Sequence, residues 1–278
     1  MSGVNEALKA AADHLSDTSD TARLDAELLM AHALGVTRSD LLLRHMRDEA
    51  PSLFAELIER RRRHEPVAYI TGEQEFFGRT FAVSPAVLIP RSDSETPVLA
   101  ALEAHPAAAR ILDCGTGSGA LLLTLLAELP QAHGVGIDSS PDALAIAAAN
   151  AARLGLSQRA ELRSADWREP GWTEALGTFD LVIINPPYVE ETAELDPSVR
   201  DYEPHAALYS GPEGLEDYRA LIPQLPALLE PGGIAVLEIG HAQAEAVSAI
   251  AATAGFAVEL RRDLAGRPRA LILRSSCR

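Results

Sequence analysis

Apolar residues divide the chain into two parts with different periodicities. In residues 4–64 they recur at helical spacing, as at Leu24, Leu28 and Ala31, which predicts amphipathic helices that bury these residues in a small bundle. From residue 110 onward, short apolar runs of strand length alternate with longer helical segments. That alternation is typical of βαβ units and a mostly parallel sheet.

Capping residues and prolines set the boundaries of the helical part. Ser39 is expected to cap a helix over residues 40–45, because its hydroxyl oxygen can accept a hydrogen bond from a backbone N–H of the first turn. Glu65-Pro66 should end the bundle, since proline cannot donate the next backbone hydrogen bond. Residues 69–72 are then expected to be extended.

A β-hairpin is expected to connect the two parts. Residues 75–77 and 80–83 have the composition of paired strands, with Gly78-Arg79 as a two-residue turn. These boundaries divide the chain into a helical domain over residues 1–73, a hairpin and linker over residues 74–92, and an α/β domain over residues 93–278.

The α/β part is predicted to alternate strands and helices as far as its end. Strands are predicted at residues 111–113, 135–138, 160–164, 179–185, 234–239, 257–262 and 270–274. Helices are predicted at residues 120–129, 141–154, within 215–229, and at 242–254. Ser140 should cap the second of these helices, with Pro141 in its first turn.

The charge of the chain disfavours nucleic acid as a partner. The net charge is −16, with 10 basic and 14 acidic side chains in residues 1–84 and 14 basic and 26 acidic in the remainder. A protein that neutralises many phosphates usually has a basic surface. The run Arg60-Arg61-Arg62-Arg63 is the exception, and it is either a solvated helix end or a docking patch for an acidic partner.

Composition also indicates the compartment. The chain is 47% hydrophobic, which suits a globular core, and no apolar stretch is long enough to span a membrane. Residues 1–15 lack the basic and apolar regions of an export signal. Cys114 and Cys277 have neither disulfide-framework nor metal spacing, so we expect a cytoplasmic protein without a metal site. We also expect a monomer with no membrane partner.

The run Asn185-Pro186-Pro187-Tyr188 follows a strand that it cannot continue. Proline has no N–H and holds the preceding residue extended, so this segment presents acceptors without neighbouring donors. The Asn185 side-chain oxygen and the Pro186 carbonyl suit the two hydrogens of a planar NH2 group, and Tyr188 offers a ring face to its plane. The segment therefore predicts a site for a primary amide or an exocyclic amine.

A glycine-rich loop between a strand and a helix predicts a cofactor site. It comprises Asp113, Cys114, Gly115, Thr116, Gly117, Ser118 and Gly119, in which the glycines allow a sharp turn and close approach of a ligand. Asp138 ends the next strand, where a carboxylate can bind both hydroxyls of a ribose. NAD and a purely structural turn are alternatives. The G-x-G-x-G spacing and the carboxylate of Asp113, which would repel a pyrophosphate, favour S-adenosylmethionine.

Two further pairs lie at the same predicted edge of the sheet. Asp166 is expected to accept from an adenine amine and Trp167 to pack near the ring, although Trp167 could instead anchor a loop. Glu238 and His241 end a later strand, where a structural hydrogen-bonding role is favoured over zinc binding.

Together these motifs resemble the HemK-type protein-(glutamine-N5) methyltransferases that modify peptide chain release factors. The resemblance covers nearly the whole chain; besides the glycine loop and residues 185–188, it rests on R-L-D-A-E at 23–27, E-P-V-A-Y-I-T-G at 65–72, L-I-P-R at 88–91, L-E-I-G-H at 237–241 and D-L-A-G-R at 263–267. Ser92, Ser94 and Cys114 depart from the usual family residues.

The resemblance implies a helical N-terminal domain joined by a hairpin to a seven-stranded, Rossmann-like methyltransferase fold. It also implies S-adenosylmethionine as cofactor and the glutamine of the Gly-Gly-Gln motif of release factors as substrate. A ribosomal-protein glutamine methyltransferase, a DNA or RNA amino-methyltransferase and a scaffold without turnover are the alternatives.

Overall fold

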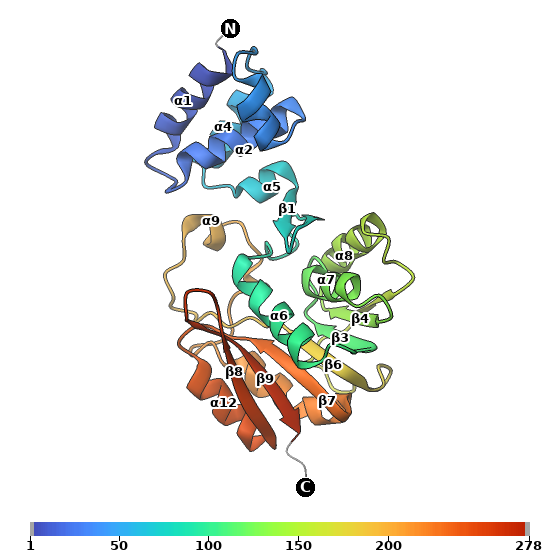
Figure 1. The fold of residues 1–278 in the computed structure, drawn as a ribbon. Coiled ribbons are helices and arrows are strands. Elements are labelled where there is room, and N and C mark those ends of the chain that lie inside the picture. The colour runs from blue at the N-terminus through green and yellow to red at the C-terminus, as the bar shows by residue number, and fades with distance from the viewer. Residues whose placement is uncertain (1–2, 276–278) are drawn as a thin grey trace. The chain divides into compact units, whose positions relative to one another are not determined.

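The computed structural model describes residues 3–275 and divides into two compact units (Figure 1). The helical unit comprises Met1–Glu73 together with Leu195–Tyr202, and the α/β unit comprises Gln74–Glu194 together with Glu203–Arg278. The chain thus passes from one unit to the other after Glu73, Glu194 and Tyr202. Cys277 lies outside the described residues. No helix among residues 3–275 has the length and apolarity needed to cross a membrane.

The helical unit packs its helices around a small apolar core that includes Leu8, Leu15, Leu29, Met30 and Leu57. Its helices are α1 (Val4–Leu15), α2 (Ala22–Leu34), α3 (Arg38–Asp40), the π-helical turn Leu41–His45, α4 (Leu53–Arg62), α5 (Val67–Thr71) and, from the inserted segment, α9 (Pro197–Arg200). The predicted helical bundle is therefore confirmed, although some of its details differ.

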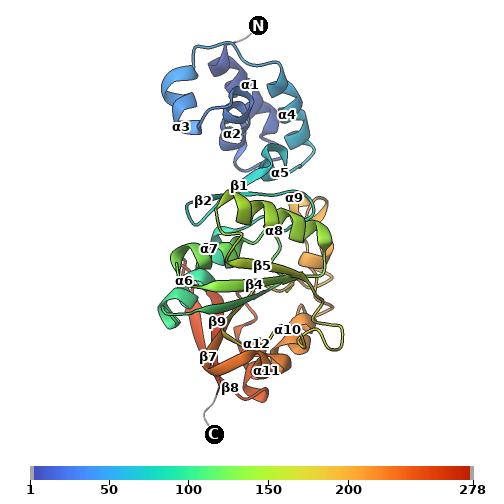
Figure 2. The same ribbon diagram turned by 90° about the vertical axis from the view of Figure 1, so that its right-hand side faces the viewer.

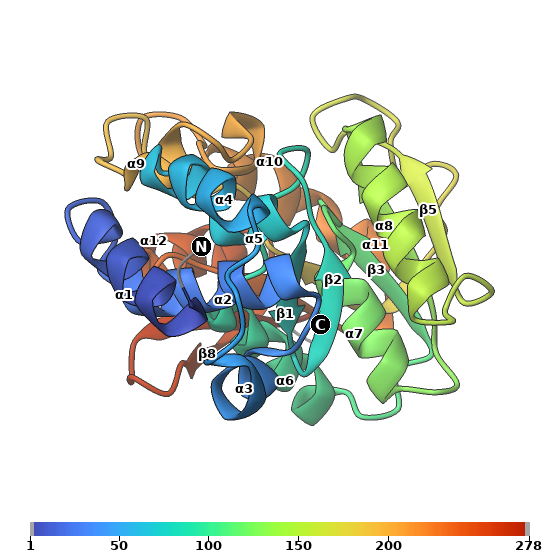
Figure 3. The ribbon, with the colours of Figure 1, turned by 90° about the horizontal axis from the view of Figure 1, so that it is seen from above.

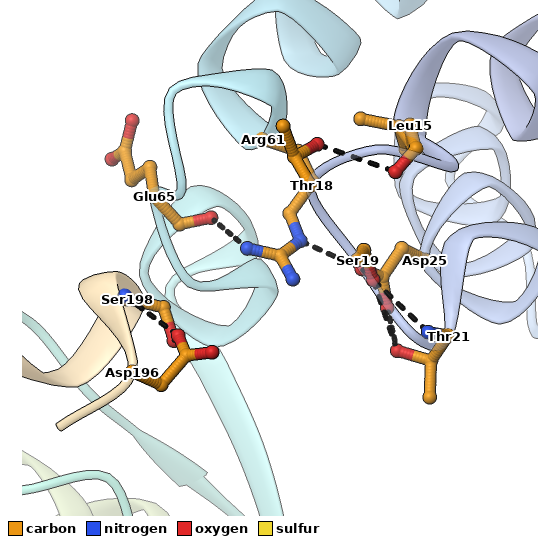
Figure 4. A network of polar contacts seen from close by, with 9 residues as sticks. All are labelled: Leu15, Thr18, Ser19, Thr21, Asp25, Arg61, Glu65, Asp196 and Ser198. Carbon is orange, nitrogen blue, oxygen red and sulfur yellow. Dashed lines mark hydrogen bonds and ion pairs between the residues drawn. The ribbon is translucent and has the colours of Figure 1, made fainter. Parts of the chain in front are cut away.

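The prediction that Leu24 and Leu28 face the core of the bundle is wrong. They are 41% and 37% exposed, whereas the acidic side chains of Asp25 and Glu27 are buried. Asp25 Oδ2 accepts from Arg61 Nε at 2.6 Å (Figure 4). Glu27 forms ion pairs with two further arginines, Arg23 and Arg38. Because these ion pairs and hydrogen bonds compensate the buried charges, α2 turns its acidic residues inward.

Two local predictions in this unit are also wrong. Thr37, rather than Ser39, caps the helix, and its Oγ1 accepts from the backbone N of Asp40 at 3.1 Å. Residues 69–71 belong to α5 instead of being extended. Pro66 precedes α5, where its missing N–H costs nothing, so this proline begins a new helix after α4 has ended.

The predicted hairpin forms, but its turn is shifted by one residue. Strands β1 (Glu73–Phe76) and β2 (Arg79–Ala82) enclose Phe77 and Gly78. Both turn residues have left-handed backbones, with φ of 51° and 69°, as a type I′ turn requires. The twist of the paired strands thus imposes a left-handed conformation on Phe77, which sequence alone did not predict.

A seven-stranded sheet of order β5-β4-β3-β6-β7-β9-β8 forms the centre of the α/β unit. The strands are β3 (Arg110–Cys114), β4 (His133–Asp138), β5 (Ala160–Ser164), β6 (Phe179–Ile184), β7 (Leu229–Glu238), β8 (Phe256–Arg262) and β9 (Pro268–Ser275). All neighbours from β5 to β7 are parallel, and β9 is antiparallel to both β7 and β8. The mostly parallel α/β fold is confirmed.

Helices cover both faces of this sheet (Figures 2 and 3). They are α6 (Glu95–Ala104), α7 (Ala120–Glu128), α8 (Pro141–Arg153), α10 (Glu216–Leu221), α11 (Leu225–Leu228) and α12 (Ala244–Thr253), with single 3-10 turns at Ser92–Ser94, His205–Ala207 and Ile222–Gln224. Leu181 and Ile183 of β6 join the cluster of α6 and α7, and Val182 and Ile184 join that of α10 and α12. Because neighbouring residues of β6 face opposite layers, the strand is apolar throughout.

Candidate functional site

The sheet topology places two of the predicted motifs side by side. From β3 the chain continues to β4 and β5 on one side and then returns to place β6 on the other, so β3 and β6 flank the point where the strand order reverses. Cys114 pairs with Ile184 in register. Gly115 and Asn185, the next residues of the two strands, therefore leave the sheet at the same level, where open α/β sheets bind their ligands.

A cleft of about 270 Å³ lies at this edge, within the α/β unit. The sequence-predicted site residues on its wall are Gly115, Thr116, Gly117, Ser118, Asp138, Asp166, Trp167, Asn185 and Pro187. Asp113, Gly119, Pro186 and Tyr188 do not line it. Apolar residues from the hairpin and the segment after it, among them Phe76, Val87 and Leu88, complete the wall. The cleft thus combines a polar edge with an apolar side.

The glycine loop is held against the neighbouring strand by backbone bonds. The N–H groups of Gly115 and Thr116 both donate to the carbonyl of Ile137, at 2.9 and 2.8 Å. Gly115 has φ of 76°, and a Cβ there would lie 3.2 Å from Trp167 Cη2. Glycine is therefore required at position 115 by both its backbone conformation and the nearby indole.

Asp113 lies buried beneath this loop. Its Oδ2 accepts from Thr116 Oγ1 at 2.7 Å, and its Oδ1 has no hydrogen-bond partner. Burial raises the pKa of Asp113 to about 7, against the opposing effect of the Thr116 hydrogen bond. An unpaired carboxyl oxygen buried beneath the loop is an acceptor, and a positive charge bound above the loop would stabilise its ionised form.

Asp138 joins the ends of two strands through its carboxylate. Oδ2 accepts from the N–H of Gly117 and Oδ1 from the N–H of Ser140, each at 2.9 Å. Each carboxylate oxygen has more than one lone pair, so both remain able to accept from a diol in the cleft. Ser140 also caps α8, as predicted, and accepts from the N–H of Ala143.

Trp167 is anchored through its ring nitrogen. Its Nε1 donates to Asp217 Oδ1 at 2.8 Å, and Arg168 forms an ion pair with the same buried carboxylate. Its ring edge lies against Gly115. Trp167 therefore anchors its loop and lines the cleft, so the two predicted roles do not exclude each other.

The side chain of Asn185 is directed by a residue far away in sequence. Its Nδ2 donates to Ser94 Oγ at 3.3 Å, so its Oδ1 is left for another partner. Tyr188, three residues further on, donates its hydroxyl to Glu238 Oε1 at 3.2 Å. Burial raises the pKa of Tyr188, as does the charge of Glu238, so the hydroxyl keeps its proton.

Several residues of this site were missed or left open by sequence reasoning. Ser94 was noted only as a departure from the family, and Glu203, which is buried and bonds Arg91 at 2.7 Å, was not noted at all. Glu238 has the structural hydrogen-bonding role that was favoured for it, while His241 is exposed.

Part of the arginine run is not solvated. Arg60 forms an ion pair with Glu65, and Arg61, 12% exposed, binds Asp25. Arg62 lies 3.9 Å from Glu59. At least the first two arginines therefore stabilise the helical unit instead of serving as free cations at a helix end.

Comparisons with known proteins identify the family. Residues 6–72 match the PrmC N-terminal domain, and residues 105–256 match a methyltransferase domain. The chain is 44% identical over 272 residues to the release factor glutamine methyltransferase of Cereibacter sphaeroides, with 95% of each chain covered. The chain belongs to the release factor glutamine methyltransferase family. The Caulobacter vibrioides member is 42% identical over 279 residues, covering 96% of this chain and 94% of that one.

Solved structures support the fold of this family member. A methyltransferase from Pyrococcus furiosus aligns with a TM-score of 0.53 and 18% identity, covering 71% of this chain and 89% of that chain. A ribosomal protein L11 methylase from Lactobacillus delbrueckii subsp. bulgaricus aligns with a TM-score of 0.52 and 20% identity, covering 73% and 90%. At this identity the likeness shows a shared methyltransferase fold.

Proposed function

We propose that this protein methylates the side-chain nitrogen of the glutamine in the Gly-Gly-Gln motif of peptide chain release factors, with S-adenosylmethionine as the methyl donor. Its membership of the release factor glutamine methyltransferase family supports the substrate. The single structural observation that carries the proposal is the in-register pairing of Cys114 with Ile184, which brings Gly115 and Asn185 to one edge. The proposed setting is the cytoplasm, with the enzyme as a monomer.

The residues of the cleft fit S-adenosylmethionine. Asp138 would accept from the ribose hydroxyls, and Asp166 and Trp167 would hold the adenine. The Oδ1 of Asp113 is unpaired, and in its ionised form this carboxyl would place negative charge beneath the loop where an α-ammonium group would bind. The absence of a Cβ at Gly115 leaves room between the loop and the indole. When bound, this cofactor supplies a methyl group on a positively charged sulfur, from which a nitrogen nucleophile can take it.

The chain holds the acceptor amide by hydrogen bonds to its two N–H groups. A glutamine amide is a poor nucleophile because its nitrogen lone pair is delocalised into the carbonyl. Asn185 Oδ1 and the Pro186 carbonyl would each accept from one N–H, which orients the nitrogen toward the cofactor side of the cleft. As the nitrogen becomes positive its N–H groups become more acidic, so these bonds strengthen toward the transition state. The proton is then lost to solvent, without a preformed base.

The test is a methylation assay with labelled S-adenosylmethionine and intact release factor. Incorporation of one methyl group at the Gly-Gly-Gln glutamine, identified by mass spectrometry and abolished when that glutamine is replaced, is the expected result. Ribosomal proteins and nucleic acid are assayed in parallel. Label in either of them, with none in the release factor, would assign the enzyme to one of the two other substrate classes.

A further inference from the structure

A buried carboxylate behind the cleft holds the indole that lines it. Asp217 lies in α10 and its surface is fully buried. Its Oδ1 accepts from Trp167 Nε1 at 2.8 Å, and each of its oxygens accepts from Arg168 Nη2 at 2.8 Å. Trp167 and Arg168 line the cleft, whereas Asp217 does not. Asp217 therefore acts on the cleft through the side chains that it binds.

The Trp167 indole is held at one end by Asp217 and meets the glycine loop at the other. Nε1 lies in the five-membered ring, whereas Cη2 and Cζ3 lie at the far edge of the six-membered ring. A Cβ at Gly115 would be 3.2 and 3.3 Å from these two carbons. An indole N–H can only donate a hydrogen bond, and inside a protein it usually has an acceptor. The position of the ring against the loop thus depends on the acceptor that Asp217 provides.

The same carboxylate is joined to the segment that follows Asn185. Asp217 Oδ2 accepts from Ser210 Oγ at 2.7 Å, and Ser210 Oγ accepts from the N–H of Asp217 at 2.8 Å. The N–H of Ser210 donates to the carbonyl of Val189 at 2.9 Å. The carbonyl of Leu208 accepts from the N–H groups of Tyr188 and Val189, at 3.1 and 2.8 Å. An unbroken chain of hydrogen bonds therefore runs from the indole to the end of residues 185–188.

The bonds to Asp217 use the full acceptor capacity of one carboxylate. Oδ1 accepts from Trp167 and Arg168, and Oδ2 accepts from Arg168 and Ser210. Each carboxylate oxygen has two lone-pair sites, so rotation of the group would break several bonds at once. The guanidinium of Arg168 compensates the buried negative charge. Asp217 is therefore a fixed point for both of the segments that it binds.

We propose that Asp217 is a positioning residue that holds the Trp167 indole and, through Ser210, residues 185–188 in a fixed relation to each other. This inference rests on the proposed function, in which Trp167 holds the adenine and residues 185–188 hold the acceptor amide. Methyl transfer requires the acceptor nitrogen in line with the methyl–sulfur bond. An anchor common to both sites limits their relative motion, and it orders the indole before the cofactor binds.

Calorimetry with S-adenosylmethionine tests the bond to the indole. Asp217→Ala removes every acceptor, so cofactor affinity should fall about 10- to 100-fold, the equivalent of one hydrogen bond to a charged group. Asp217→Asn can keep Oδ1 toward Trp167 and donate from Nδ2 to Ser210 Oγ. The side chain of Arg168 is 55% exposed and can turn to water. Affinity in Asp217→Asn should therefore stay within about threefold of wild type.

A double-mutant cycle identifies the route by which Asp217 acts. Trp167→Phe has no indole N–H, so adding Asp217→Ala to it should cause no further loss of cofactor affinity. Asp217→Glu keeps the charge but moves the acceptor by one methylene, and it should weaken cofactor binding more than Asp217→Asn does. A charge effect on the cofactor would give the opposite order of the last two variants.

Ser210→Ala tests the connection to the acceptor segment. It removes the hydroxyl that bonds Asp217 but leaves the bond to the indole, so cofactor affinity should stay within about threefold. The kcat for release factor methylation should fall about 3- to 10-fold, the equivalent of one neutral hydrogen bond. A kcat within twofold of wild type would contradict the connection to residues 185–188.

The helical unit offers a matched pair of controls. Asp25 is buried and accepts from Arg61 Nε at 2.6 Å and from Ser19 Oγ at 2.7 Å, as Asp217 accepts from an arginine and a serine. Asp25→Ala should leave cofactor affinity unchanged, and Ser19→Ala should leave kcat unchanged. A loss of cofactor affinity in Asp25→Ala as large as in Asp217→Ala would reveal general damage and overturn the inference.

An NMR measurement keeps the inference independent of turnover. The chain has two tryptophans, Trp167 and Trp172, and Trp172 Nε1 donates to Gln224 Oε1 at 2.6 Å. Their indole N–H signals can be assigned by the loss of one in Trp172→Phe. The Trp167 N–H should exchange with solvent faster in Asp217→Ala than in the wild type, whereas the exchange rate of the Trp172 N–H should not change.

These measurements distinguish failure of the inference from failure of the proposed function. If the wild type methylates release factor but Asp217→Ala keeps its cofactor affinity within threefold, or loses it equally in the Trp167→Phe background, the inference is wrong and the proposed function stands. If the wild type methylates no release factor but the effect of Asp217→Ala on affinity and exchange requires Trp167, the positioning of the indole stands and the proposed function is wrong. Should Asp217→Ala not fold, the order of Asp217→Asn and Asp217→Glu decides, together with Ser210→Ala.

Discussion

In the proposed reaction, Asn185 is the residue on which the chemistry depends most directly. Replacing it with alanine removes the acceptor for one N–H of the substrate amide but leaves the glycine loop and Asp138 in place. We expect Asn185→Ala to lower kcat by about 10²- to 10³-fold, as loss of one preorganised polar group at a reacting centre does. Calorimetry should show unchanged cofactor affinity. Asn5→Ala, an exposed asparagine of α1, is the control, and turnover within about threefold of wild type would contradict the assignment.

Asp113 gives a pH-dependent contribution to stability. Its pKa is about 7 in the folded protein, raised by burial from 3.8. Between these two pH values the Asp113 carboxyl is protonated in the folded protein and ionised in the unfolded chain. Its contribution to the free energy of unfolding is therefore complete below pH 3.8 and is lost as pH rises through about 7. The shift corresponds to at most about 4 kcal/mol in the free energy of unfolding.

Urea unfolding of Asp113→Asn tests this contribution. Because the amide does not titrate, the variant should gain stability relative to the wild type as pH rises from about 5 to about 8. Asp142→Asn, an exposed aspartate in the first turn of α8, should show no such trend. A stability difference between Asp113→Asn and wild type that is constant with pH would mean that the Asp113 carboxyl titrates near its ordinary pKa.

At the scale of elements, two glycines with similar backbone conformations allow the cost of backbone strain to be distinguished from the cost of a steric clash. Gly115 and Gly155 have φ of 76° and 70°, but a Cβ would meet the Trp167 ring only at Gly115, with open space at Gly155. Alanine at either position should cost about 1–2 kcal/mol of stability from the left-handed backbone. Only Gly115→Ala should also weaken cofactor binding, by about tenfold or more, because the indole must move. Equal cofactor affinity in the two variants would show that the Gly115–Trp167 contact does not shape the cleft.

The strands that carry the site were predictable because their physical signals are local. Each is an apolar run ended by glycine, proline or a carboxylate, and Asn185 and Asp138 were placed from that pattern alone. The helix α6 was missed because it follows an irregular stretch and contains Pro97 near its start, where a proline is tolerated. Ser94, at its N-terminus, was therefore not connected with Asn185.

Other features depend on partners distant in sequence, which periodicity does not detect. The inward orientation of Asp25 depends on Arg61, 36 positions away. The contact of Tyr188 with Glu238 spans 50 positions, and that of Asn185 with Ser94 spans 91. Charged residues are normally assigned to the outside of a helix, so a buried ion pair reverses the predicted face. The orientation of the Asn185 amide required the structure for the same reason.

At the scale of the whole molecule, the segment after Tyr188 contributes to both units. Leu195–Tyr202 belongs to the helical unit, and the chain returns at Glu203, which bonds Arg91 in the α/β unit. Within the helical unit, Tyr202 Oη donates to the carbonyl of Arg63 at 2.6 Å. Positive charges of His64 and Arg61 act on Asp196, whose pKa is lowered chiefly by its hydrogen bonds from Ser198 (Figure 4). The segment is thus covalently continuous with residues 185–188, which we propose to bind the acceptor amide, and is fixed to the helices of its own unit.

This continuity predicts how recognition of a whole release factor depends on the helical unit. A site that binds only an NH2 group cannot select its protein, so selectivity must come from contacts remote from the methyl group. If the helical unit provides these remote contacts, loosening the Leu195–Tyr202 segment should weaken the connection between the helical unit and residues 185–188. We expect Tyr202→Phe, which loses one hydrogen bond, to lower kcat/KM for intact release factor about 2- to 10-fold.

The same variant should leave two other quantities unchanged: cofactor affinity, and the low rate on a short peptide that carries the Gly-Gly-Gln sequence but lacks the rest of the release factor. Tyr209→Phe is the matched control, because Tyr209 lies in the same loop but within the α/β unit, where its ring packs against His205. A loss of rate on intact factor and peptide alike would place the effect of Tyr202 in the catalytic site. No loss on either substrate would mean that selection of the release factor does not depend on the Tyr202 hydrogen bond.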